Sequence, residues 1–175
     1  MTLLVELSSG RNHWVGTYGP LLALYWTRAL EPTVYLKLAD YVKKCAERQE
    51  SGRLSVLSIA LPGAQSPTSE GRRALVSLLR ETDRCVSRVA IMREGQGFVA
   101  STVVSVMSGI QMLAKANAGH KFFGSMHEAV IWATADLPEY REGGQSVEET
   151  VLTLEKQRKS LSIKMGESSQ RSERV

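Results

Sequence analysis

Three hydroxyl side chains stand together where the sequence predicts the start of a helix. Ser66 is followed by Pro67, Thr68 and Ser69, and Ser before Pro is typical of an N-cap followed by the first helical position. The free N–H groups and the dipole at a helix start also favour an added phosphate. Two interpretations stay open: Ser66, Thr68 and Ser69 form a phosphorylation or anion site, or they only cap the helix.

A second candidate for anion binding is the glycine-containing turn Glu94-Gly-Gln-Gly-Phe98. It follows a predicted strand and opens a predicted helix, which is the usual setting for phosphate contacts. It lacks the third glycine and the downstream acidic residue of a dinucleotide-binding motif. We therefore expect a tight structural turn here.

The side chains that catalyse reactions or bind metals are few and scattered. His13, His120 and His127 are not spaced with one another or with a cysteine as metal ligands are, and no Gly-x-Ser-x-Gly motif is present. We predict no catalytic residues, no metal, no cofactor and no enzymatic activity. Cys45 and Cys85 do not form a dense disulfide framework, so we expect free thiols and a cytoplasmic location.

Composition limits the classes of partner. The chain has 175 residues, 43% of them hydrophobic, and a net charge of +4, which suits a single globular domain. No run of Lys and Arg exceeds two residues, so we expect no nucleic-acid binding. The longest charge-free stretch, 95–114, contains Ser, Thr and Gln, which predicts no membrane insertion. The N-terminus does not resemble a signal peptide.

Hydrophobic patterning predicts an α/β fold. Three early strands, 3–7, 13–18 and 21–26, are close enough in sequence to form an antiparallel meander. The pattern then alternates between helices and strands. The predicted helices begin at Glu31, Ser66, Phe98 and Ser125, and the predicted strands are 54–60, 87–92 and 121–123. Such alternation predicts parallel strands joined by right-handed crossovers.

Composition changes after Pro138, so we divide the chain into a domain, 1–138, and a polar tail, 139–175. The tail is predicted to contain a linker, a helix over 147–161 and a disordered end over 166–175. An apolar stripe runs along this helix through Val147, Val151, Leu154 and Leu161. It is too short for a coiled coil alone, so it docks on the domain or on a second copy.

Three segments together resemble the bacterial STAS-like proteins, relatives of the anti-sigma-factor antagonist fold. They are 66–80, 89–101 and 121–132, the last containing Phe-x-Ser-x-x-Glu-Ala-x-x-Trp. The resemblance covers roughly 13–135. It implies a mixed sheet of about five to six strands with helices mainly on one face. It also implies binding without catalysis and, in the antagonist branch, phosphorylation at the start of the second helix, where Ser66, Thr68 and Ser69 lie.

The helix predicted over 98–115 carries no charge until its last residue. A surface helix normally has a polar face, so this one is either buried on both sides or contacts another subunit. The predicted interface residues, which would form a homodimer, are Val99, Val103, Val106 and Ile110, or the opposite stripe of Thr102, Ser105 and Gln111.

Four aromatic residues cluster in the early strands: Trp14, Tyr18, Tyr25 and Trp26. They form either part of the core or an apolar pocket. Two functions follow. The first is a non-enzymatic bacterial regulatory or adaptor protein that binds a protein partner of unknown identity. The alternative is a small-molecule or lipid-binding domain with an apolar pocket between sheet and helices.

Overall fold

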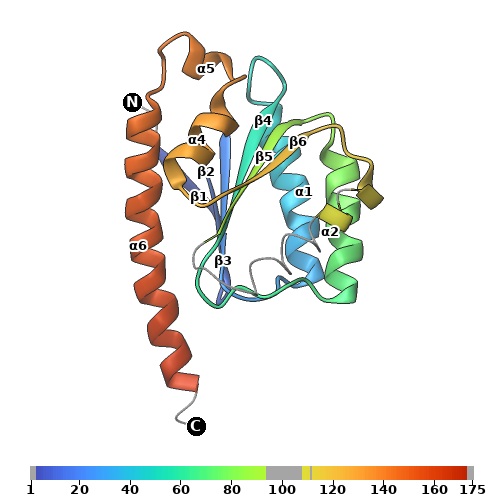
Figure 1. Ribbon diagram of the computed structural model, residues 1–175, viewed down its shortest axis with the longest axis vertical. Coiled ribbons are helices and arrows are strands. Elements are labelled where there is room, and N and C mark those ends of the chain that lie inside the picture. The colour runs from blue at the N-terminus through green and yellow to red at the C-terminus, as the bar shows by residue number, and fades with distance from the viewer. Residues whose placement is uncertain (1–2, 94–107, 111, 173–175) are drawn as a thin grey trace.

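The chain folds around one six-stranded sheet (Figure 1). The structure, a computed structural model, describes residues 3–93, 108–110 and 112–172, and of residues 163–172 only the backbone. The strands are β1 (Leu4–Ser9), β2 (His13–Tyr18), β3 (Leu21–Trp26), β4 (Leu54–Ala60), β5 (Val86–Arg93) and β6 (Gly119–Phe123). The labelled helices are α1 (Pro32–Ala46), α2 (Ser69–Thr82), α4 (Met126–Thr134), α5 (Pro138–Arg141) and α6 (Val147–Ser172).

The spatial order of the strands follows their order in the chain. Strands β1, β2 and β3 pair antiparallel, and β3 to β6 pair parallel. The β2–β3 hairpin turns at Gly19, whose φ of 57° suits glycine, and the register pairs Tyr18 with Leu21. The predicted α/β class and mixed sheet are confirmed.

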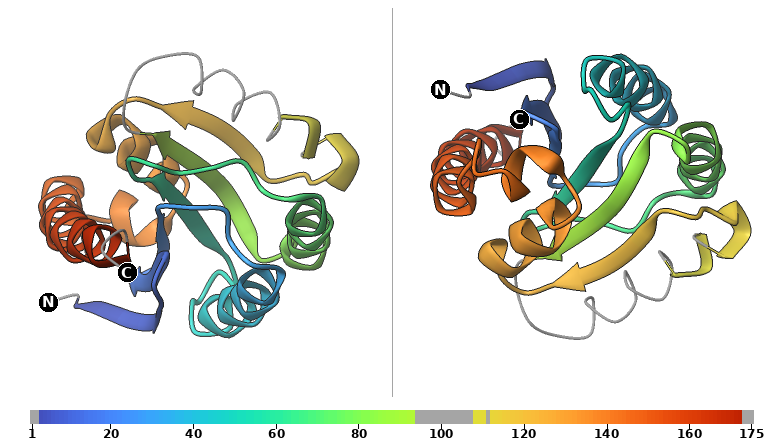
Figure 2. Two further views of the ribbon diagram at one scale, coloured as in Figure 1. Left: turned by 90° about the horizontal axis from the view of Figure 1, so that it is seen from below. Right: turned by 90° about the horizontal axis from the view of Figure 1, so that it is seen from above.

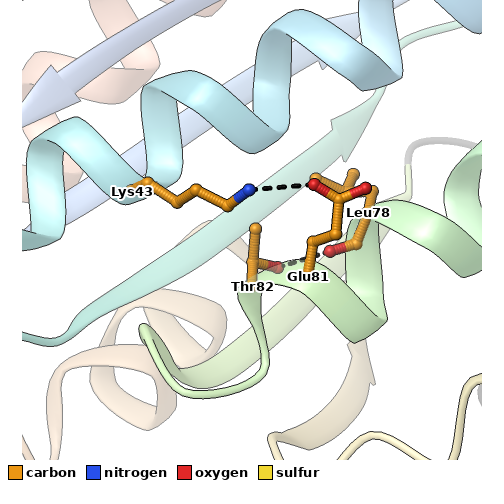
Figure 3. A network of polar contacts seen from close by, with 4 residues as sticks. All are labelled: Lys43, Leu78, Glu81 and Thr82. Atoms are coloured by element: carbon orange, nitrogen blue, oxygen red, sulfur yellow. Dashed lines mark hydrogen bonds and ion pairs between the residues drawn. The ribbon is translucent and has the colours of Figure 1, made fainter.

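One face of the sheet is covered by α1 and α2 (Figure 2). Each of these helices joins two neighbouring parallel strands, and crossovers of one hand that advance by one strand place their helices on the same side. Leu24 of β3, Leu38 of α1 and Leu75 of α2 contribute to this core. Lys43 donates to Glu81 across the two helices at 2.9 Å, and the pair is drawn in Figure 3. Both side chains are exposed to solvent, so the ion pair adds little to the free energy of unfolding.

The opposite face is covered by α4 and α6 (Figure 2). We expected helices mainly on one face, whereas both faces have them. The α6 stripe contacts the domain through Leu154 and Leu161, which are 0% and 5% exposed. The Tyr25 hydroxyl donates to the Leu154 carbonyl at 2.8 Å. The tail therefore docks on its own domain, one of the two alternatives that the sequence left open.

The backbone of α6 continues past the predicted end at Leu161, to Ser172. It enters the segment that we expected to be disordered and extends beyond the sheet (Figure 1). Gly166 is the only strong helix breaker in this stretch, and a single glycine costs a helix about 1 kcal/mol without ending it.

Candidate apolar ligand site

The two faces of the central strand β4 are covered to different extents. Both edges of β4 are paired, with β3 and with β5. Leu57 and Ile59 point toward α4 and α6 and are 0% exposed. Val56 and Ser58 alternate with them on the other face and are only half-buried. Because neighbouring strands already shield the edges, this exposure means that α1 and α2 leave part of the sheet uncovered.

A cavity of about 90 Å³ lies at this place, between the sheet and the two helices. Aliphatic and aromatic side chains make up most of its wall. They come from β3, β4, β5, α1 and α2, and include Leu22, Tyr35, Leu38, Val56, Leu75 and Val89. Burial raises the pKa of Tyr35 to about 12, as expected for a phenol among apolar neighbours.

Few polar side chains line the cavity. Ser58 faces it from the central strand, and its Oγ accepts a hydrogen bond from the Trp26 indole N–H at 3.0 Å. Thr82, at the end of α2, donates its hydroxyl to the Leu78 carbonyl at 2.8 Å (Figure 3). The Thr82 hydroxyl is therefore already used within its own helix.

Asp83 also lines the cavity, and its carboxylate is engaged by the loop that leads into β6. It accepts hydrogen bonds from the backbone N–H and the side-chain amide of Asn117, both at 2.6 Å, and from the Ala118 N–H at 3.3 Å. The Asn117 contacts lower the pKa of Asp83. This carboxylate fastens the loop to the end of α2.

His120 is a further polar residue of the wall. Its Nδ1 lies 2.7 Å from the Ala118 carbonyl, and its Nε2 is buried with no partner among the described residues. Burial lowers the pKa of this imidazole. A neutral ring that donates from Nδ1 has a bare acceptor at Nε2.

The three predicted hydroxyl residues lie at the start of α2, outside the cavity. Thr68 is the N-cap, and its side chain accepts from the Gly71 N–H at 3.1 Å. Ser66 is half-buried in the preceding loop, and Ser69 is an exposed first residue of the helix. The observed role of Thr68 is capping, and phosphorylation at any of the three stays a prediction.

The predicted interface residues are only partly observed. Val99, Val103 and Val106 lie outside the described residues, as do the opposite stripe and the turn over 94–98. Ile110 is 2% exposed and packs in the core on the α1 and α2 face. Met112 and Leu113 follow it and are 80% and 65% exposed. Ile110 therefore contributes to its own domain. Among the described residues of this segment, the exposed apolar side chains are Met112 and Leu113, which the sequence analysis did not select.

The early aromatic residues divide between the two faces. Trp14 and Tyr25 pack edge to face at 5.6 Å on the side of α4 and α6. Trp26 lies on the other face and lines the cavity. The pocket therefore lies between sheet and helices and takes only Trp26 of this cluster, and ligand binding there stays a prediction.

The sequence analysis did not select the polar residues of the cavity as site residues. Ser58 carried one usable signal, because it is one of two serines, with Ser55, in a largely apolar strand at a central position of the sheet. Within 3–93, 108–110 and 112–172, no three His, Cys, Asp or Glu side chains are grouped to hold a metal ion.

In the part of the chain that the structure describes, no helix has the length and apolarity needed to span a membrane. Comparison with protein-family models, curated proteins and solved structures finds no match. The case for function consequently depends on the geometry of the cavity.

Proposed function

We propose that this protein is a non-enzymatic binding domain that takes a small apolar molecule into the cavity between the sheet and helices α1 and α2. The observation that carries the proposal is the 90 Å³ of space over β4, with Val56 and Ser58 accessible within an apolar wall. A ligand that fills this space removes apolar wall surface from water, which is favourable by about 25 cal/mol per Å².

The volume limits the ligand to a few carbon atoms. An engineered apolar cavity of about 150 Å³ binds benzene, and this one, at about 90 Å³, is smaller. A five-membered ring such as cyclopentane is a suitable probe.

The polar groups of the wall already have structural partners. Thr82 and Asp83 are held in hydrogen bonds that shape the fold. No nucleophile is recorded in contact with the His120 ring among the described residues. General acid–base chemistry needs a donor or acceptor placed against a reacting group, and these groups mainly serve the structure.

Methyl-group NMR with cyclopentane as the probe tests the proposal. We expect saturable shifts in the methyl signals of Val56, Leu22 and Ile91. The change Val56→Phe fills the cavity and should abolish these shifts. Leu36→Phe, at a position of α1 that is 56% exposed, is the matched control and should leave binding intact. Absence of saturable shifts in the unmodified protein would overturn the proposal.

A second candidate function is regulation through contact with a protein partner. The observation that favours it is the exposed pair Met112 and Leu113. The Arg80 guanidinium donates to the Leu113 carbonyl at 2.7 Å, which fixes this pair beside α2. A contiguous exposed apolar patch is typical of an interaction surface, and in this proposal the pair forms part of one.

The partner can be this chain itself or another protein. Light scattering should then give twice the monomer mass, or a specific protein should copurify. The double change Met112→Glu with Leu113→Glu should abolish that association without unfolding the domain. A monomer from which no specific protein is recovered would count against this candidate.

A further inference from the structure

Ser58 gives the cavity a chemical preference as well as a shape. If the cavity binds a ligand, as proposed above, we infer that this ligand is a small neutral molecule whose ether or carbonyl oxygen accepts the hydroxyl proton of Ser58. The inference concerns the class of ligand, and it rests on the proposed function.

The position of the Ser58 hydroxyl is fixed by its neighbours. The side chain faces the cavity from the central strand and is half-buried. Trp26 donates to its Oγ at 3.0 Å, which uses one lone pair and orients the oxygen. Among the described residues no acceptor is recorded for the hydroxyl proton. A serine hydroxyl is one donor and two acceptors, so the proton is the part left for a ligand.

The apolar surroundings of Ser58 favour a hydrogen bond from this proton to a ligand. Its neighbours on the same face of the strands, Val56 and Ile91, are apolar, and so is most of the cavity wall. A bound acceptor would replace the solvent at this half-buried hydroxyl, and one neutral hydrogen bond contributes about 1 kcal/mol. Binding sites of this kind typically combine apolar walls with a few polar groups that orient the ligand.

The charge of the wall excludes ionic ligands. Among the described residues, the lining includes Asp83 but no lysine or arginine. A carboxylate or phosphate would lose its hydration without gaining a cation. The Asp83 carboxylate is itself engaged by Asn117, so a cationic ligand has little free charge to meet. The fitting class is therefore an uncharged ether or ketone with a small hydrocarbon body.

Two five-membered rings of nearly equal shape, cyclopentane and tetrahydrofuran, show how much of the affinity comes from the hydrogen bond and how much from the fit of the ring. Tetrahydrofuran carries an ether oxygen where cyclopentane has a methylene group. The measured quantity is the ratio of their dissociation constants, obtained by methyl NMR on the full chain. Because tetrahydrofuran is better hydrated, only the change in this ratio between variants is informative.

The decisive change is Ser58→Ala. We expect it to shift the ratio about five- to tenfold against tetrahydrofuran, the factor for one neutral hydrogen bond. Ser58→Thr keeps the hydroxyl and should retain the original ratio. Ser55→Ala is the matched control: Ser55 lies on the same strand, its alternation places it on the opposite face, and it is 1% exposed. It should leave the ratio unchanged.

The outcomes distinguish the two proposals. Saturable binding of cyclopentane with the same ratio in the unmodified protein and in Ser58→Ala would overturn the Ser58 inference and leave the cavity function standing. Failure of both rings to bind would overturn both. Binding of tetrahydrofuran that Ser58→Ala weakens and Ser58→Thr retains would support the inference, provided that both variants give the methyl spectrum of a folded domain.

Discussion

The imidazole of His120 lies against the cavity and is largely removed from water. Its pKa is lowered from 6.5, first by burial, while the hydrogen bond to the Ala118 carbonyl and the charge of Asp83 oppose this shift. The pKa of His13 is lowered too, by burial and by Lys37. Both histidines therefore bind a proton more readily in the unfolded chain than in the folded one.

This difference predicts a loss of stability in acid. As pH falls below about 6.5, the unfolded chain takes up protons first, so the free energy of unfolding decreases until the folded-state pKa values are passed. Urea denaturation at about pH 7.5 and about pH 5 measures the decrease. His120→Gln should make it smaller, because one of the two sites is removed.

The control for this prediction is His127→Gln, at an exposed position of α4. That variant should keep the full decrease. An equal decrease in the His120→Gln variant and in the unmodified protein would show that His120 does not contribute to the acid dependence.

At the scale of elements, Thr68 is the N-cap residue that begins α2. The side chain accepts from the Gly71 N–H, one of the four amides that a helix start leaves without partners. We predict that Thr68→Ala lowers the free energy of unfolding by about 1 kcal/mol. Ser69→Ala, one residue further at an exposed position, should cost less than about 0.5 kcal/mol. Equal losses in thermal denaturation would contradict the assignment of Thr68 as the cap.

Helix α6 is held to the domain by one face. Leu154 is 0% exposed and Leu152 is 56% exposed, although they are two residues apart on the same helix. Leu154→Ala should cost roughly 2–5 kcal/mol, since it leaves a hole in a packed core. Leu152→Ala should cost less than about 0.5 kcal/mol. Denaturant titration compares them, and similar losses would mean that α6 is not docked through Leu154.

At the scale of the whole molecule, the sheet needs both of its helical layers. Without α6, Trp14, Tyr25 and Leu57 would lose part of their cover. We predict that a chain ending at Ser146 is less stable by several kcal/mol and self-associates in sedimentation experiments. A chain ending at Ser162 keeps the docked stripe and should behave as the full chain does. Unchanged stability of the shorter chain would contradict the structural role of α6.

The order of strands and helices could be predicted from the sequence because local patterns determine it. Alternating residues over 13–18 and 21–26 and the apolar run over 54–60 correspond to observed strands. Ser and Pro near residue 66 marked the start of α2 to within a few residues, and the apolar stripe of the tail marked the docking face of α6. The end of α6 was missed because a helix can continue through a lone glycine.

The candidate site required the tertiary structure. Ser55 and Ser58 are three residues apart in one strand, so they face opposite sides of the sheet. Only the packing of the helices decides that the side of Ser58 has a cavity while Ser55 is buried. Ile110 looked like an interface residue because sequence does not show what covers an apolar helix. Local sequence determined the elements by their periodicity, whereas the empty space arises from side chains distant in sequence that fill the interior incompletely.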